Sequence, residues 1–149
     1  EARNAIERKG VAVRQYLEEV VKIAETLASL PQTATALSGF DRGAAALLDD
    51  ASLQPDMTKL AARYEVQAAR MTDAGTDAQA RWMSGLDPLA QRLQHLYVST
   101  NPNEVGQKHL LDTAGDDSAY SALHRQLHPS YRAFMERYGF YDLFLIEPQ

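Results

Sequence analysis

Hydrophobic residues recur at helical spacing over most of this 149-residue chain, which predicts a mainly α-helical fold. The clearest stripe covers residues 1–30, where apolar side chains repeat every seven residues. The repeating positions are Ile6, Val13, Val20 and Leu27, supported by Leu17 and Ala24 and widened by Tyr16, Ile23 and Leu30. Four heptads at this spacing predict one long helix that packs along its length on another helix or on a second copy of the chain.

Shorter apolar stripes follow as far as residue 98 and predict a helical bundle over residues 31–98. Pro31 ends the first helix, because the residue before a proline is displaced from helical geometry. The next helices are expected at about residues 33–49, 56–72 and 86–98, with a further, broken helix near Trp82. Ser84 and Asp87 have capping-box spacing, and Pro88 suits a first helical turn. Two glycines in the 33–49 helix, Gly39 and Gly43, either permit close helix packing or weaken the helix.

Residues 99–118 form the longest region without helical periodicity. Asn101-Pro102-Asn103 is a turn signal, and glycines interrupt the region twice more. A loop of this length in a compact domain is functional, disordered, or contains a short helix. Three aspartates surround Gly115 without the spacing of an EF-hand, so we expect them to form a turn and a helix cap.

The segment 119–149 predicts a helix followed by a β-strand. Asp117 or Ser118 caps the helix, Pro129 kinks or divides it, and Gly139 ends it. From Phe140 to Ile146 the pattern is apolar on both faces, as in a strand buried on both sides. The chain ends too soon to supply a partner strand and begins at glutamate, so we expect it to be a piece of a longer protein.

Composition excludes several classes of function. The net charge of -5, without a run of lysine or arginine, argues against nucleic-acid and anionic-membrane partners. No apolar stretch approaches the ~20 residues of a membrane span. Cysteine is absent, which excludes disulfides and a cysteine nucleophile. The sequence also lacks a glycine-rich phosphate loop, a GxSxG motif and a zinc-protease helix, so we expect no enzymatic activity and no cofactor.

Candidate ligand-binding residues gather in the second half of the chain. Tyrosine, histidine and asparagine side chains supply hydrogen bonds, and a lysine supplies a charge for a carboxylate. These residues are Tyr97, Asn101, Lys108, Tyr120, His124, His128, Tyr131 and Tyr141. The same aromatic side chains would equally serve as core packing.

The two histidines His124 and His128 are spaced to project from one helix face and would form half of a metal site. A carboxylate, His95 or His109 would have to complete it. The alternative is a pair of hydrogen-bonded structural histidines, because a short motif of this kind is not specific.

The run LQHLYVSTNPNEVGQKHLL, at residues 93–111, is followed by Tyr120, His124, His128-Pro129 and Arg132, and then by GFYDLFLIEP. These blocks resemble the extracytoplasmic input domains of bacterial methyl-accepting chemotaxis receptors, and related domains of transmembrane sensor cyclases and phosphatases. The resemblance covers residues from about 14 to 147. It implies a Cache (PAS-like) module with a long first helix leading out of the membrane and a last strand that begins a sheet. It implies no catalytic residue.

The sequence therefore predicts a single periplasmic sensor domain, part of a membrane-anchored receptor. Its expected parts are a signalling and dimerisation helix (1–30), a helical bundle (31–98), a loop region (99–118), and a helix and strand (119–149) that begin a truncated Cache/PAS-like sheet. A small molecule of unknown class would bind near the Asn101 loop, and the heptad face would form a homodimer. The alternatives are a structural or partner-binding bundle without a ligand, and a metal-responsive domain using His124 and His128.

Overall fold

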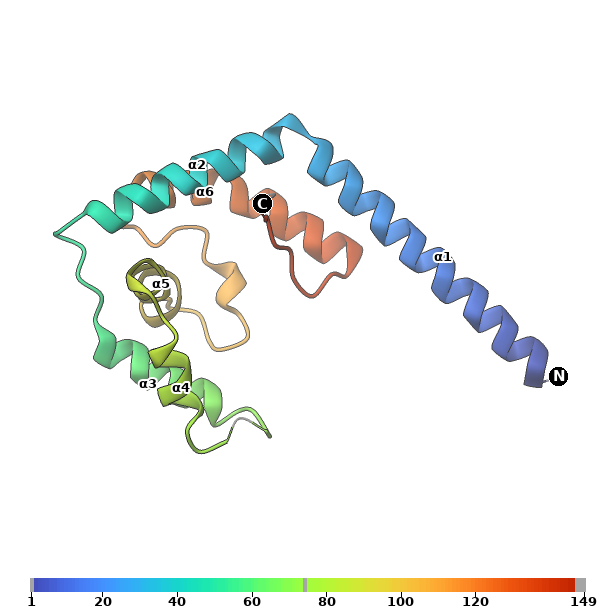
Figure 1. Ribbon diagram of the computed structural model, residues 1–149, viewed down its shortest axis with the longest axis horizontal. Coiled ribbons are helices and arrows are strands. Elements are labelled where there is room, and N and C mark those ends of the chain that lie inside the picture. The colour runs from blue at the N-terminus through green and yellow to red at the C-terminus, as the bar shows by residue number, and fades with distance from the viewer. Residues whose placement is uncertain (1, 74, 147–149) are drawn as a thin grey trace. The chain divides into compact units, whose positions relative to one another are not determined.

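The computed structural model describes residues 2–73 and 75–146, and its regular structure is helical (Figure 1). The helices are α1 (Ala2–Ser29), α2 (Pro31–Asp49), α3 (Met57–Ala68), α4 (Ala78–Ser84), α5 (Pro88–Gln94) and α6 (Ala119–Tyr138). There are also two single turns of helix: the π-helical turn η1 (His95–Ser99), which directly follows α5, and the 3-10 turn η2 (Lys108–Leu110), which lies in the segment before α6. The prediction of a mainly α-helical chain is therefore confirmed.

The chain divides into two compact units, and each is described by itself. Residues up to Leu37, together with Leu145 and Ile146, belong to the first unit, and Ser38–Phe144 form the second. All of the predicted ligand-binding residues lie in the second unit.

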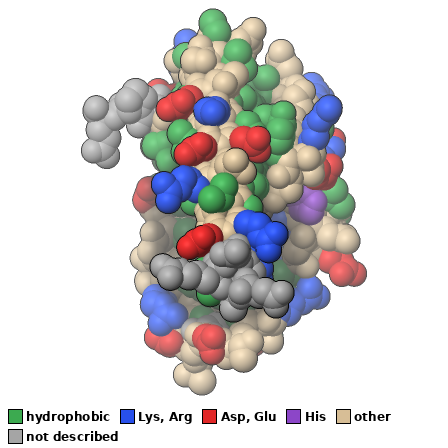
Figure 2. Space-filling view, turned by 90° about the vertical axis from the view of Figure 1, so that its right-hand side faces the viewer, with side chains coloured by type: hydrophobic (Ala, Val, Ile, Leu, Met, Phe, Trp, Pro, Cys, Tyr) green, Lys and Arg blue, Asp and Glu red, His purple; other side chains and the backbone are tan. Residues whose placement is uncertain are grey.

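The first unit is dominated by α1, the long helix that the heptad repeat predicts. Much of its apolar face is exposed: Ile6 is 71% exposed, Val13 58% and Leu17 55%. On the face of the molecule that Figure 2 shows, hydrophobic side chains alternate with acidic and basic ones. Among the described residues, no helix is both long enough and apolar enough to cross a membrane.

Short polar residues begin three helices of the second unit. Asp56, Asp87 and Ser118 each accept a hydrogen bond from the backbone N–H three residues later, at 3.0, 2.7 and 3.1 Å. These side chains satisfy N–H groups that have no partner inside the helix. The cap of α5 is thus Asp87, whereas the Ser84 hydroxyl donates to the backbone carbonyl of Arg81 in α4.

Two packing contacts position the elements of the second unit. Helix α3 packs against α4 and η1, and Leu60, Ala78 and Leu96 are buried there. Helices α2 and α6 approach closely at Gly43, where an added Cβ would lie 2.9 Å from the Cα of Tyr120. Close packing is therefore the explanation for the glycine at position 43.

Helix α6 is continuous through Pro129, so this proline does not divide the helix. Gly139 ends it in the left-handed conformation, with φ 67°, as the sequence predicts. The backbone N–H of Phe140 then donates to the carbonyl of Met135 at 3.0 Å.

The predicted C-terminal strand is wrong. Residues 140–146 are irregular, and Tyr141, Phe144 and Ile146 are 99%, 73% and 79% exposed. An apolar pattern makes a strand only where a neighbouring strand completes its hydrogen bonds, and no strand occurs among the described residues. The predicted Cache/PAS-like sheet is accordingly absent from the part of the chain that the structure describes. Residues 147–149 of the predicted helix-and-strand segment lie outside the described residues, as do residues 1 and 74.

Candidate functional site

The π-helical turn η1 packs against α3 and follows α5 directly in the second unit. Its hydrogen bond runs from the N–H of Thr100 to the carbonyl of His95 at 3.1 Å, five residues back. Single π-turns within helices occur frequently at functional sites. Tyr97 on this turn contacts residues of α6, while Val98 lines a cleft with residues of α3 and α4.

An aromatic cluster forms where Tyr97 meets α6. Its ring centroid is 5.8 Å from that of Tyr120 and 4.6 Å from that of His124, and Phe40 of α2 lies 5.1 Å from Tyr120. The Tyr97 hydroxyl shares a 2.7 Å hydrogen bond with the buried Ser121 hydroxyl. Burial raises the pKa of Tyr97 to about 12, so the phenol is neutral at physiological pH.

The histidine pair belongs to the same cluster, and its geometry favours the structural interpretation over metal binding. The rings of His124 and His128 stack at 4.4 Å with an interplanar angle of 20°. His124 Nδ1 donates to the Asp112 carbonyl at 2.9 Å, and His128 Nε2 donates to the His109 carbonyl at 2.6 Å. Lone pairs lie in the ring plane, so two nearly parallel stacked rings do not converge on one ion.

The described residues contain no group of three His, Asp or Glu side chains placed to hold a metal ion. His95, one of the candidate third ligands, instead accepts a hydrogen bond from the N–H of Asp56 at 3.2 Å. Burial lowers the pKa of His124, which keeps its imidazole neutral.

Asn101 organises the loop over residues 99–118. Its side chain is buried, and its amide donates to the carbonyls of Tyr97 and Lys108 at 3.0 and 3.1 Å. Its oxygen accepts from the backbone N–H of Asn103 at 2.9 Å. Since these contacts use the polar atoms of Asn101, its role is to position the loop that carries Lys108.

Both flanking helices hold this loop. From α6, His128 and Arg132 donate to the carbonyl of His109, and Arg132 also pairs with the Asp112 carboxylate at 2.7 Å. Arg63 of α3 donates to the carbonyl of Asn103, and Arg70, in the turn after α3, donates to that of Val105 at 3.0 Å. The loop is therefore ordered, with the short helix η2 that a region of this length can contain.

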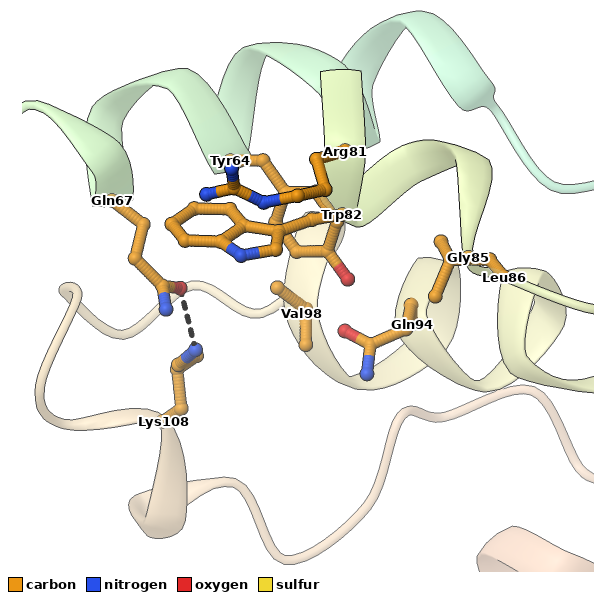
Figure 3. A pocket seen from close by; sticks show the side chains of 9 residues that line it. All are labelled: Tyr64, Gln67, Arg81, Trp82, Gly85, Leu86, Gln94, Val98 and Lys108. Carbon is orange, nitrogen blue, oxygen red and sulfur yellow. Dashed lines mark hydrogen bonds between the residues drawn. The ribbon is translucent and has the colours of Figure 1, made fainter. Parts of the chain in front are cut away.

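An open cleft of about 540 Å³ lies between α3, α4, η1 and the loop (Figure 3). It is lined by Tyr64, Gln67, Arg81, Trp82, Gly85, Leu86, Gln94, Val98 and Lys108. Small-molecule sites have volumes of roughly 300–1,000 Å³ and combine apolar walls with a few polar groups. Here the rings of Tyr64 and Trp82 meet edge to face at 5.8 Å, beside the polar ends of Gln67 and Lys108.

Lys108 supplies the charge in this cleft. Its Nζ donates to Gln67 Oε1 at 3.0 Å, the bond drawn in Figure 3. Partial burial, together with the nearby positive charge of Arg63, lowers the pKa of Lys108 from its ordinary value of 10.5. The other basic lining residue, Arg81, lies about 3.4 Å from both carboxylate oxygens of Asp77.

The structure brings together four of the eight predicted ligand-binding residues in the aromatic cluster: Tyr97, Tyr120, His124 and His128. Asn101 lies next to them, and Lys108 lines the separate cleft. Tyr131 is half-buried on α6, and Tyr141 is 99% exposed outside both groups. Sequence analysis missed the other cleft residues, although Trp82, the single tryptophan, was a signal.

The chain matches no protein-family model, no curated protein and no solved structure.

Proposed function

We propose that this chain is the extracytoplasmic ligand-sensing domain of a transmembrane chemoreceptor, and that its small-molecule ligand binds in the cleft beside Lys108. The observation that supports this proposal is the cleft itself, in which amide and ammonium groups converge beside an aromatic and aliphatic wall. The resemblance of residues 93–111 to chemoreceptor input domains supports the membrane-anchored, periplasmic context. The proposal does not depend on a PAS-like sheet.

The loop over residues 99–118 connects the cleft to α6, so ligand binding in the cleft would affect contacts of α6. Lys108 lines the cleft, and the carbonyl of the next residue, His109, accepts hydrogen bonds from His128 and Arg132 of α6 at 2.6 and 3.2 Å. A ligand that displaces Lys108 would change these two bonds. It would shift the equilibrium between two arrangements only as far as it binds one of them more tightly.

The exposed apolar face of α1 is the proposed homodimer seam. Ile6, Val13 and Leu17 are each more than half exposed in the single chain, and they belong to the heptad stripe. A second copy of the same helix would bury this stripe along its length, as in a coiled coil. In a membrane-anchored receptor this helix would carry the signal.

A partner-binding helical bundle without a small ligand is the second candidate. It is favoured by the aromatic cluster, in which the rings of Phe40, Tyr97 and Tyr120 fill the space between the helices. The two candidates differ in one respect that can be tested, which is whether the cleft takes up a ligand.

The test is thermal unfolding of the purified chain against amino acids, organic acids, amines and divalent metals, for wild type and for Gly85→Phe. Gly85 lines the cleft, a Cβ there would meet only backbone oxygens at 3.8 Å, and φ is -85°, so a phenylalanine can be placed on the cleft wall without backbone strain. A ligand at ~100 times its Kd adds about 2.7 kcal/mol of stability. We expect a rise of the unfolding midpoint in wild type that Gly85→Phe abolishes.

Gln15→Phe is the control, because Gln15 is exposed on α1 and lies off the apolar heptad face. This control should respond to ligand like wild type. The proposal would be wrong if no compound raised the midpoint, or if Gly85→Phe responded as strongly as wild type.

A further inference from the structure

We infer that the cleft beside Lys108 selects an organic anion, namely a small monocarboxylate with an apolar body. This inference rests on the proposed function, since it names the chemical class of the ligand for the same cleft. It is carried by the charge of the lining residues, by the free donors of Lys108, and by the shape of the apolar wall.

The lining is basic although the protein as a whole is acidic, with a net charge of -5. None of the nine lining residues is acidic, and two of them, Arg81 and Lys108, are basic. Arg81 already lies beside the carboxylate of Asp77. Lys108 has only the neutral amide of Gln67 as its hydrogen-bond partner among the described residues. One ammonium without a counter-ion therefore matches a ligand with one negative charge.

The donors are arranged for a carboxylate. An ammonium has three N–H groups, and Lys108 uses one of them on Gln67 Oε1. Two remain for a ligand. The Gln67 oxygen accepts from Lys108, so the amide nitrogen of Gln67 is not used in this bond (Figure 3). An anion bound here would also offset the cost of partly burying the Lys108 charge beside Arg63.

A cationic ligand fits the same wall poorly. The wall contains Tyr64 and Trp82, and tyrosine and tryptophan are residue types that form aromatic cages for ammonium groups in other proteins. Figure 3, however, shows the Arg81 side chain running along the Trp82 indole, with Lys108 on the opposite side of the cleft. An amine would enter between two cationic side chains with no carboxylate among the lining residues. The aromatic and aliphatic surfaces of Tyr64, Leu86 and Val98 instead suit the uncharged body of the ligand.

The experiment uses two sets of three compounds that share a body and differ only in charge. Benzoate, benzamide and benzylamine form one set, and isovalerate, isovaleramide and isopentylamine the other. Each compound is titrated at constant ionic strength into the purified chain, with affinity measured by calorimetry and by the shift of the unfolding midpoint. We expect the carboxylate of at least one set to bind at least tenfold more tightly than its amide and its amine.

Four variants connect this preference to Lys108. Lys108→Met removes the ammonium, and Lys108→Gln keeps a donor for Gln67 in case the methionine variant does not fold. A hydrogen bond to a charged group contributes enough for its loss to weaken binding by roughly 10- to 100-fold. Lys108→Arg keeps the charge and should keep the preference for the carboxylate. Lys22→Met, which removes an exposed lysine on α1, should change nothing.

Failure of this inference is distinguishable from failure of the proposed function. If an amide or amine binds more tightly than its carboxylate, and Gly85→Phe abolishes that binding, the cleft is a ligand site but the ligand is not an anion. If the carboxylates bind equally to wild type and to both uncharged Lys108 variants, the inference is wrong as well. If no carboxylate binds, the inference fails, and the broader ligand panel then decides the proposed function separately.

Discussion

Replacement of Gly43 by alanine tests the close approach of α2 and α6 on which the aromatic cluster depends. The new Cβ would lie 2.9 Å from the Cα of Tyr120, 3.0 Å from its N and 3.2 Å from its Cβ. Two of these are backbone atoms inside α6, so relief requires the helices to move apart. Overpacking of this kind costs roughly 1–3 kcal/mol, while alanine in place of glycine adds about 0.5–1 kcal/mol of helix stability. The free energy of unfolding should therefore fall, by up to about 2.5 kcal/mol.

Gly39→Ala is the matched control on the same helix. Its Cβ would lie 2.7 Å from Leu123 Cδ2, but the next Leu123 atoms are at 3.9 Å, so only the end of a flexible side chain is in the way. A changed leucine rotamer costs about 0.5–1.5 kcal/mol, which the helix-propensity gain largely offsets. We expect Gly39→Ala to be close to wild type in stability and clearly more stable than Gly43→Ala.

Urea unfolding followed by far-ultraviolet circular dichroism gives both free energies on one scale. Near-ultraviolet circular dichroism would also report a disturbance of the tyrosines in the cluster in Gly43→Ala. If Gly43→Ala equalled or exceeded Gly39→Ala in stability, α2 and α6 would not pack at this distance in solution, and the account of the cluster would be wrong.

Three further predictions follow from the same contacts. Burial lowers the pKa of His124 in the folded state, so the folded protein should lose stability as the pH falls below 6.5, the ordinary pKa of histidine. Urea midpoints measured from pH 8 to pH 5 should therefore decline less steeply for His124→Gln than for wild type, and an equal decline would refute the lowered pKa of His124. Asn101→Ala should lower the free energy of unfolding by about 1–3 kcal/mol, because the carbonyls of Tyr97 and Lys108 lose their donor. It should also speed amide hydrogen exchange across residues 101–111, and unchanged exchange would contradict the role of Asn101 in positioning the loop. Val13→Glu combined with Leu17→Glu should abolish dimers in sedimentation equilibrium while Gln15→Glu, off the apolar face, should not, and a monomeric wild type at high concentration would exclude the seam.

The helices were predictable because their limits are encoded locally. Pro31 separates the first two helices, Ser118 caps α6 through its own side chain, and Gly139 adopts the left-handed conformation that ends it. The strand from Phe140 to Ile146 was not predictable in this way, because its existence depends on a partner elsewhere in space. Tyr141, a predicted ligand-binding residue in that segment, is 99% exposed.

The candidate site likewise combines locally encoded features with features that depend on contacts between distant segments. His124 and His128 share a helix face, so their spacing predicted that they would meet. Gln67 and Trp82 come from α3 and α4, and helical periodicity does not encode which side chains of two packed helices will face a common cleft. The charge of Lys108 is evident from the sequence, but its place in the cleft depends on the contacts that fix the loop.

Trp82 provides the most direct test of ligand binding in the cleft. It is the only tryptophan in the chain, so its indole N–H gives one resonance that reports from the cleft wall. Isotope-labelled chain would be titrated with the carboxylate panel, for wild type, Gly85→Phe and Gln15→Phe. The account predicts a saturable shift of the indole resonance in wild type and Gln15→Phe that is absent in Gly85→Phe. An indole resonance that stays fixed with every compound in all three proteins would contradict it.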